Sequence, residues 1–191
     1  MGMTLELNHA LHVRSYPGSP RGGDTGLVIP SEDGALAILI DATGHGLSAY
    51  AIAQKARQLV QTYAHCAPDE LLMHLDRGLR GTDGCAAAVV RIEGESLSFA
   101  GIGNIGVRLN QKQIHSKTGI VGQRMRTPEL TRHAFPAGSC LVMHTDGVSS
   151  PSQIPLGSPN TIVHKLVESQ GSLHDDASAL AICWQDKTPL C

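Results

Sequence analysis

Apolar residues follow two spacings along the chain, and each spacing predicts a different kind of element. Residues 35–44, ALAILIDATG, form an apolar run of strand length that stops at Asp41. Residues 46–64 place apolar side chains every three or four positions with polar ones between them, which predicts an amphipathic helix packed on one side. Pro68 suits the first turn of a second helix at residues 68–80.

The rest of the chain is dominated by short predicted strands. Residues 85–103 predict a hairpin that turns at Glu93-Gly94, and residues 106–116 predict a second one around Asn110 to Lys112. Glycine, proline and serine at 16–26 predict an irregular loop, and residues 117–128 predict another. A last helix is predicted at 160–170, with strands at 130–135, 140–147 and 177–184. Hairpins around a helical pair favour an α+β sandwich of two mostly antiparallel sheets flanked by helices.

Composition narrows the function classes. The 191 residues carry 17 acidic and 15 basic side chains, a formal net charge of −2, and only 3% aromatic residues. Neither a basic surface for nucleic acid nor an aromatic stacking platform is therefore expected. We expect one domain at 1–185 with a short tail at 186–191. No apolar run reaches the length of a signal peptide or membrane span, so we expect a cytoplasmic protein with no membrane partner. No coiled-coil pattern demands a second chain, and we expect a monomer.

Cysteines and two short motifs carry less information. Five widely spaced cysteines without a CxxC pair predict buried or incidental thiols in a reducing compartment. The glycines of residues 101–106, GIGNIG, match a dinucleotide-binding fingerprint, but a hairpin follows them instead of a helix, so a bulged turn is the better interpretation. His9 and His12 have the HxxH spacing of metal ligands, yet no further ligand lies near them in the sequence.

Four aspartates at element ends are the informative feature. Asp41 and Asp146 end apolar strand runs, Asp175 precedes one, and Asp24 lies in the loop RGGDTG. Antiparallel neighbours bring the end of one strand beside the start of the next, so these carboxylates can meet at one sheet edge. Such a group repels itself unless cations are present, and oxygen ligands suit Mg²⁺ or Mn²⁺. The aspartates therefore predict a two-metal site for attack on phosphorus.

The motif around Asp41 indicates a family. Residues 41–49, DATGHGLSA, resemble the D-x-x-G-H-G-x-x-A segment of metal-dependent Ser/Thr phosphatases of the protein phosphatase 2C type, in the bacterial branch with SpoIIE and RsbU. The compact length most resembles the RsbX phosphatases of bacterial stressosomes. The family arginine that binds phosphate has no match at its usual spacing; Arg14 and Arg21 are the nearest.

The resemblance implies a role for each site residue. Asp41 would bridge two Mn²⁺ or Mg²⁺ ions, and the backbone carbonyl of Ala42 would bind one. Asp146 and Asp175 would hold the other, with Asp24 acting through water. Asp41, Asp146 and Asp175 would thus act in catalysis through metal-bound water. His45 would either assist proton transfer or orient its loop.

Supporting residues are also predicted. Asp176 would sit beside the last ligand, and the turns at Gly44 and Gly147 would bring the carboxylates to the metals. Arg124 and Arg126 are candidates for substrate recognition, although they could equally be solvated charges.

The predicted function is hydrolysis of phosphoserine or phosphothreonine in proteins by a metal-bridging water. Family resemblance further suggests phosphorylated STAS-domain stressosome proteins as substrates, in resetting a stress response. A non-catalytic phosphoprotein-binding module is the alternative, and a two-metal phosphodiesterase or nuclease is a third possibility that the near-neutral charge disfavours.

Overall fold

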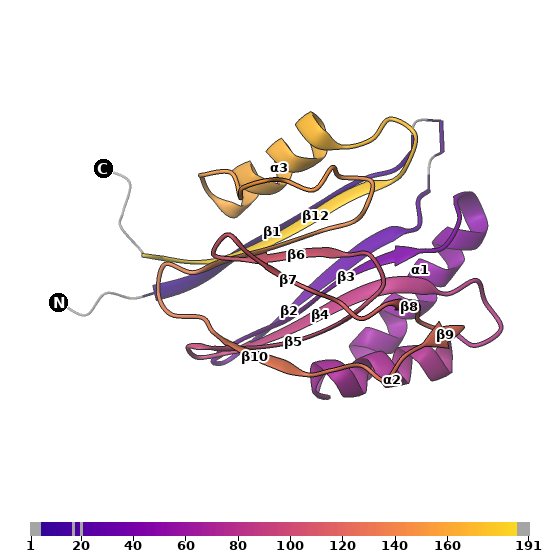
Figure 1. Cartoon of the computed structure of the whole chain (residues 1–191), viewed down its shortest axis with the longest axis horizontal. Coiled ribbons are helices and arrows are strands. Elements are labelled where there is room, and N and C mark those ends of the chain that lie inside the picture. Colours follow the sequence, from indigo (N-terminus) through magenta and orange to yellow (C-terminus); the bar gives the residue numbers. More distant parts are fainter. Residues whose placement is uncertain (1–4, 17, 20, 187–191) are drawn as a thin grey trace.

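The chain folds into two antiparallel sheets packed face to face (Figure 1). The structure, a computed structural model, describes residues 5–16, 18–19 and 21–186. In spatial order the first sheet holds β1 (Leu5–Arg14), β12 (Ala177–Asp186), β11 (Cys140–His144), β6 (Gly106–Leu109) and β7 (Lys112–Ile114). The second holds β10 (Thr131–Ala134), β5 (Ser96–Ile102), β4 (Cys85–Glu93), β3 (Gly34–Ala42) and β2 (Asp24–Ser31).

Helices cover the outer faces of both sheets, as Figure 1 shows. Helices α1 (Gly46–Thr62) and α2 (Pro68–Gly78) pack on the second sheet, and α3 (Pro159–Gln170) packs on the first. A small pair, β8 (Gly119–Ile120) with β9 (Arg124–Met125), lies beside the second sheet. The predicted α+β sandwich of two mostly antiparallel sheets flanked by helices is therefore confirmed.

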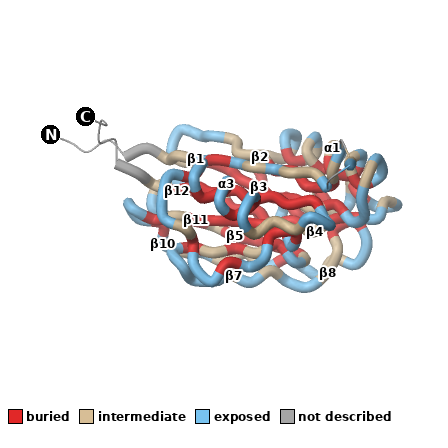
Figure 2. Tube along the Cα trace, turned by 90° about the horizontal axis from the view of Figure 1, so that it is seen from above, coloured by how far each residue is buried: buried red, intermediate tan, exposed pale blue. Residues whose placement is uncertain are grey.

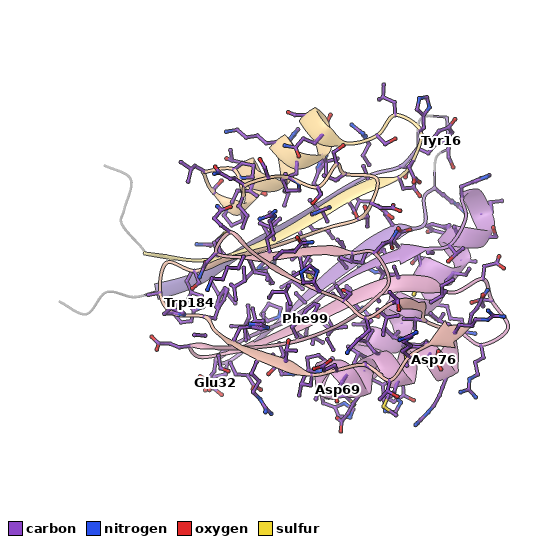
Figure 3. The ribbon with its side chains drawn as sticks, viewed as in Figure 1. Tyr16, Glu32, Asp69, Asp76, Phe99 and Trp184 are labelled. Carbon is purple, nitrogen blue, oxygen red and sulfur yellow. A yellow bond between two sulfur atoms is a disulfide. The ribbon has the colours of Figure 1, made fainter. Side chains whose placement is uncertain are left out.

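Strand alternation divides the core into layers. Along β3, Ala37 and Leu39 pack between the two sheets, while the side chains of Ile38 and Ile40 pack toward the helices. Phe99, fully buried, lies in the layer between the sheets (Figure 3). Figure 2 shows these strands as the buried part of the chain, with exposed residues concentrated in the connections. Burial of each large apolar side chain contributes about 1.5–3 kcal/mol.

Most predicted elements are present, and the differences have physical causes. The hairpin at residues 106–116 turns at Asn110 and Gln111, whose φ values of 47° and 71° match the strand twist. The irregular loop predicted at 16–26 is wrong at its end, because Asp24 already begins β2. Pairing with the apolar strand β3 overrides a glycine-rich composition that disfavours strands. The polar loop at 117–128 likewise contains the short strands β8 and β9.

The cysteines depart from expectation at one pair. Cys140 and Cys183 lie directly opposite each other on β11 and β12, with Cα atoms 4.1 Å apart, and form a disulfide, so the prediction of free thiols is wrong there. Cys66 and Cys85 are buried thiols as predicted. Burial, with a smaller contribution from the charge of Asp41, raises the pKa of Cys85 to about 12.

Residues 187–191 of the predicted tail lie outside the described residues. Within the described part of the chain, the helices are too short or too polar to cross a bilayer.

Candidate metal centre

Strand pairing places two carboxylates side by side at one edge of the second sheet. Asp41 continues the face of β3 that carries Ala37 and Leu39, so it lies at the rim of the layer between the sheets. Asp24, the first residue of β2, is its direct cross-strand partner. Opposed positions bring Cβ atoms within about 5.5 Å of each other. The two acidic groups therefore share one face of the sheet.

A hydroxyl from the first sheet connects to this pair. Thr145 follows β11, and its Oγ1 donates a hydrogen bond of 2.7 Å to Oδ2 of Asp24. The same oxygen accepts the backbone N–H of Ser178 at 3.0 Å, which leaves the hydroxyl proton free to point at Asp24. Both Thr145 and Ser178 are fully buried. This contact joins the two sheets behind the acidic rim.

The remaining aspartates come from the turns of the first sheet. Asp146 lies just after β11, and Asp175 lies just before β12, the antiparallel neighbour of β11, so both meet at one end of the sandwich. A cavity of about 500 Å³ opens there. Its lining comes from both sheets and from the β8 segment: Asp41, Ala42, Thr43, Gly44, Ala86, Gly103, Asn104, Thr118, Gly119, Ile120, Asp146 and Asp175. The structure thus brings together three of the four predicted aspartates, with Asp24 adjacent to Asp41.

Asp176, next to Asp175, binds backbone N–H groups instead of lining the cavity. Its side chain is buried, and its two oxygens accept the backbone N–H groups of Tyr16 and Gly23, each at 2.6 Å. Tyr16 lies at the far end of the molecule from Trp184 (Figure 3). Asp176 therefore fastens the segment that precedes Asp24 to this end of the sandwich.

Crowding makes these carboxylates hard to ionise. Burial, aided by the charges of Asp176 and Asp175 and opposed by hydrogen bonds from Thr145 and Ser178, raises the pKa of Asp24 to about 7. Burial, and then the charge of Asp24 and the other aspartates, raises the pKa of Asp41 to about 8. Burial also raises the pKa of Asp175. Without cations, each of these three groups therefore keeps its proton to a higher pH than a free aspartate does.

A hard divalent cation fits this arrangement. Among the described residues no basic side chain forms an ion pair with any of the four aspartates. The atoms available as metal ligands are carboxylate and carbonyl oxygens, and the cavity has room for ions together with water. Divalent cations would supply the missing positive charge and return the aspartates to their ionised form.

Backbone geometry supports the site at two glycines. Gly44, at the cavity wall, has a φ of 91°, which an L side chain rarely adopts. A side chain at Gly147 would collide with the backbone oxygen of Asp176. Ala42 lines the cavity, as a carbonyl ligand would require.

Other predicted residues lie outside the cavity lining. His45 is exposed at the N-cap of α1, and its side chain makes no capping hydrogen bond. Arg124 and Arg126 are exposed on and after β9, the strand that pairs with the cavity-lining β8. These three residues therefore flank the site and are not assembled into it.

Sequence reasoning missed Asn104. Its Nδ2 donates a hydrogen bond of 2.6 Å to Oδ2 of Asp146. Asn104 follows β5, whose end lies at the same edge as Asp41, because β3, β4 and β5 are antiparallel neighbours. A polar residue directly after an apolar strand was the available signal, within a motif interpreted only through its glycines.

Comparison with solved structures defines the class of fold as protein phosphatase 2C-like. One similar chain comes from a structural study of the bacterial stressosome, a modular system adapted to control secondary messenger signalling. It aligns with a TM-score of 0.87 and 22% identity, over 93% of this chain and 99% of the other. RsbX in complex with magnesium aligns with a TM-score of 0.85 and 16% identity, over 96% of this chain and 100% of RsbX. The catalytic domain of the Ser/Thr phosphatase PstP, solved with two manganese ions, aligns with a TM-score of 0.75 and 17% identity, over 96% of this chain and 100% of that domain.

Family membership rests on the sequence itself. The model of the Stage II sporulation protein E (SpoIIE) family matches residues 31–185, and the chain belongs to this family. The matched segment contains Asp41, Asp146 and Asp175, whereas Asp24 precedes it. Curated protein sequences give no significant match.

Proposed function

We propose that this protein is a phosphoserine/phosphothreonine protein phosphatase that depends on two Mn²⁺ or Mg²⁺ ions. The observation that carries the proposal is the meeting of Asp41, Asp146 and Asp175, from both sheets, around one cavity with Asp24 behind it. Family membership supports it, as do the magnesium of RsbX and the two manganese ions of PstP.

The side chains have distinct tasks in this proposal. Asp41, Asp146, Asp175 and the carbonyl of Ala42 would hold the ions directly, and Asp24 would act through water. When bound, the ions activate water and offset the charge of the phosphoryl group. Thr145 fixes one oxygen of Asp24, and Asn104 fixes one oxygen of Asp146, so the carboxylates enter the reaction already oriented.

Attack by water is favoured over a covalent enzyme intermediate. Cys85, the cross-strand partner of Ala42, is fully buried, and its raised pKa of about 12 keeps the thiol protonated. His45, exposed at the start of α1, remains a predicted aid to proton transfer. His45→Ala should change the pH profile of kcat if it transfers a proton, and leave the profile unchanged if it only orients the loop.

Phosphorylated STAS-domain proteins of a stressosome are the proposed substrates. The structural likeness to RsbX and to a chain of the bacterial stressosome supports this choice. Exposed Arg124 and Arg126, beside the cavity wall, would contact the phosphoprotein outside its phosphorylated residue. The expected physiological role is resetting a stress response in the cytoplasm by a monomeric enzyme.

Release of phosphate from three substrate types tests the function. We expect Mn²⁺-dependent turnover of a phosphorylated STAS domain and of an aryl phosphate, none of a phosphodiester, and loss of turnover in Asp146→Asn. Asp33→Asn is the matched control, because Asp33 is exposed and its side chain forms no hydrogen bond or ion pair with the residues that the structure describes. Binding of the phosphoprotein without turnover would favour the non-catalytic module instead, and full activity in excess chelator would refute the metal mechanism.

Location and assembly need separate measurements. Detection of the protein in separated cytoplasmic and membrane fractions of cells tests the predicted location. Sedimentation of the purified protein tests the predicted monomer.

A further inference from the structure

His9 and His12, which share the spacing of a metal motif, point to opposite faces of β1. Leu7, on the His9 face, packs between the sheets, whereas Ala10, on the His12 face, packs against the α3 side. His9 lines a separate cavity that it shares with Trp184. The two histidines therefore cannot share one metal ion, and His12 faces α3 instead.

Helix α3 supplies the ligands that the sequence around His12 lacks. His164 and Glu168 are four residues apart, one turn of the helix, and so lie on one face of it. Nε2 of His12 is 3.1 Å from Oε1 of Glu168, and the rings of His12 and His164 are stacked with centroids 4.8 Å apart. One potential ligand atom from each of the three residues lies within 4.8 Å of the others.

We propose that His12, His164 and Glu168 form a binding site for one transition-metal ion of the zinc class. Two imidazoles and one carboxylate are a ligand set that zinc accepts with a fourth position open. In a tetrahedral zinc site, ligand atoms lie about 3.4 Å apart, so ligand atoms that now lie within 4.8 Å of one another need to approach by at most about 1.4 Å. His164 and Glu168 are exposed and His12 is partly exposed, so small rotations are accessible.

Neighbouring groups suit this role. Arg14 lies with Nη1 3.8 Å from Oε2 of Glu168, while its Nη2 donates to the carbonyl of Ser172 at 2.8 Å. Arg14 thus lies on the Oε2 side of the carboxylate, while Oε1 faces His12. A cavity of about 460 Å³ beside His164 and Glu168 gives water access to the open position.

This site is independent of the aspartate centre. His12 lies on the outer face of the first sheet, under α3, whereas the aspartates lie at the rim between the sheets. Zinc bound here would link β1 to α3 through His12 and His164, which are 152 residues apart in the sequence. Such a link would stabilise the folded chain.

Zinc titration of the purified full chain tests the proposal. Calorimetry is done in millimolar Mg²⁺, which would compete with zinc for the aspartate centre. The proteins are wild type, His164→Ala and Glu168→Gln, with His9→Ala as the matched control. We expect one zinc ion per wild-type chain, unchanged binding in His9→Ala, and binding weakened at least about 100-fold in the other two variants, because a ligand contributes more than a supporting partner does.

Two further readouts separate a site from scattered binding. Zinc should raise the Tm of wild type and of His9→Ala but not of His164→Ala, and Co²⁺ should give an absorption band of low-coordinate cobalt that Glu168→Gln loses. Equal zinc binding in wild type and His164→Ala would overturn the proposal, as would the absence of zinc binding in Mg²⁺. The His12–Glu168 contact would then be an ordinary exposed ion pair.

Discussion

Replacing Asp176 by asparagine should loosen the segment that leads into Asp24. The two carboxylate oxygens accept the N–H groups of Tyr16 and Gly23 at 2.6 Å each, and only 6% of the residue is exposed. Asparagine keeps the shape but has one oxygen, so its amide NH₂ must face one of the two donors. One charge-assisted hydrogen bond is lost, and the other becomes neutral. Since each is worth about 1.5–3 kcal/mol, we expect a loss of about 2–4 kcal/mol.

Urea unfolding in chelator measures this loss without the contribution of bound ions. With an m-value of about 2 kcal/mol/M, the midpoint should fall by about 1–2 M at constant m. Asp33→Asn, an exposed carboxylate at the other end of β3, is the control and should shift the midpoint little. A loss below about 0.5 kcal/mol for Asp176→Asn would refute the assigned role of Asp176, because the two donors would then have found other partners.

Three more predictions concern the site and its surroundings. In chelator, the unfolding free energy should fall as pH rises from about 4 to about 8. The reason is that Asp24 and Asp41 have pKa values of about 7 and 8 in the folded chain but near 3.8 in the unfolded chain, so the folded state loses its proton-binding advantage as pH rises. Urea titrations at pH 5 and 8, in chelator and in Mn²⁺, check this, and a stability that rises with pH in chelator would contradict it. Asn104→Ala should weaken Mn²⁺ activation about 10-fold with unchanged Tm, as a Mn²⁺ titration of activity would show, whereas unchanged activation would mean that the amide does not position its carboxylate. Replacing Arg124 and Arg126 by Ala should lower kcat/KM for the phosphoprotein several-fold and spare an aryl phosphate; equal losses would argue against recognition.

Local patterns were enough for much of the architecture. The helical spacing of residues 46–64 predicted the buried face of α1, and the turn at Asn110 followed from hairpin chemistry. Asp41 was recognised because an apolar run ends there and a specific motif follows. These features depend on residues close together in the chain.

What the sequence did not reveal depends on distant partners. Asp24 joins a strand only because β3 pairs with it, and Asn104 matters only through Asp146, 42 residues away. Thr145 reaches across the two sheets to Asp24. His12 lacked ligands in the sequence because they come from α3. Such contacts require knowledge of which elements the fold brings together.

Location of bound manganese in crystals tests the central claim most directly. Crystals of the full chain grown with Mn²⁺ should show two anomalous-scattering peaks in the cavity, one on each side of Asp41, within bonding reach of Asp146, Asp175 and the carbonyl of Ala42. Asp41→Asn crystals should lose both peaks. A cavity without peaks in saturating Mn²⁺, or peaks found only outside this cavity, would contradict the two-metal phosphatase account.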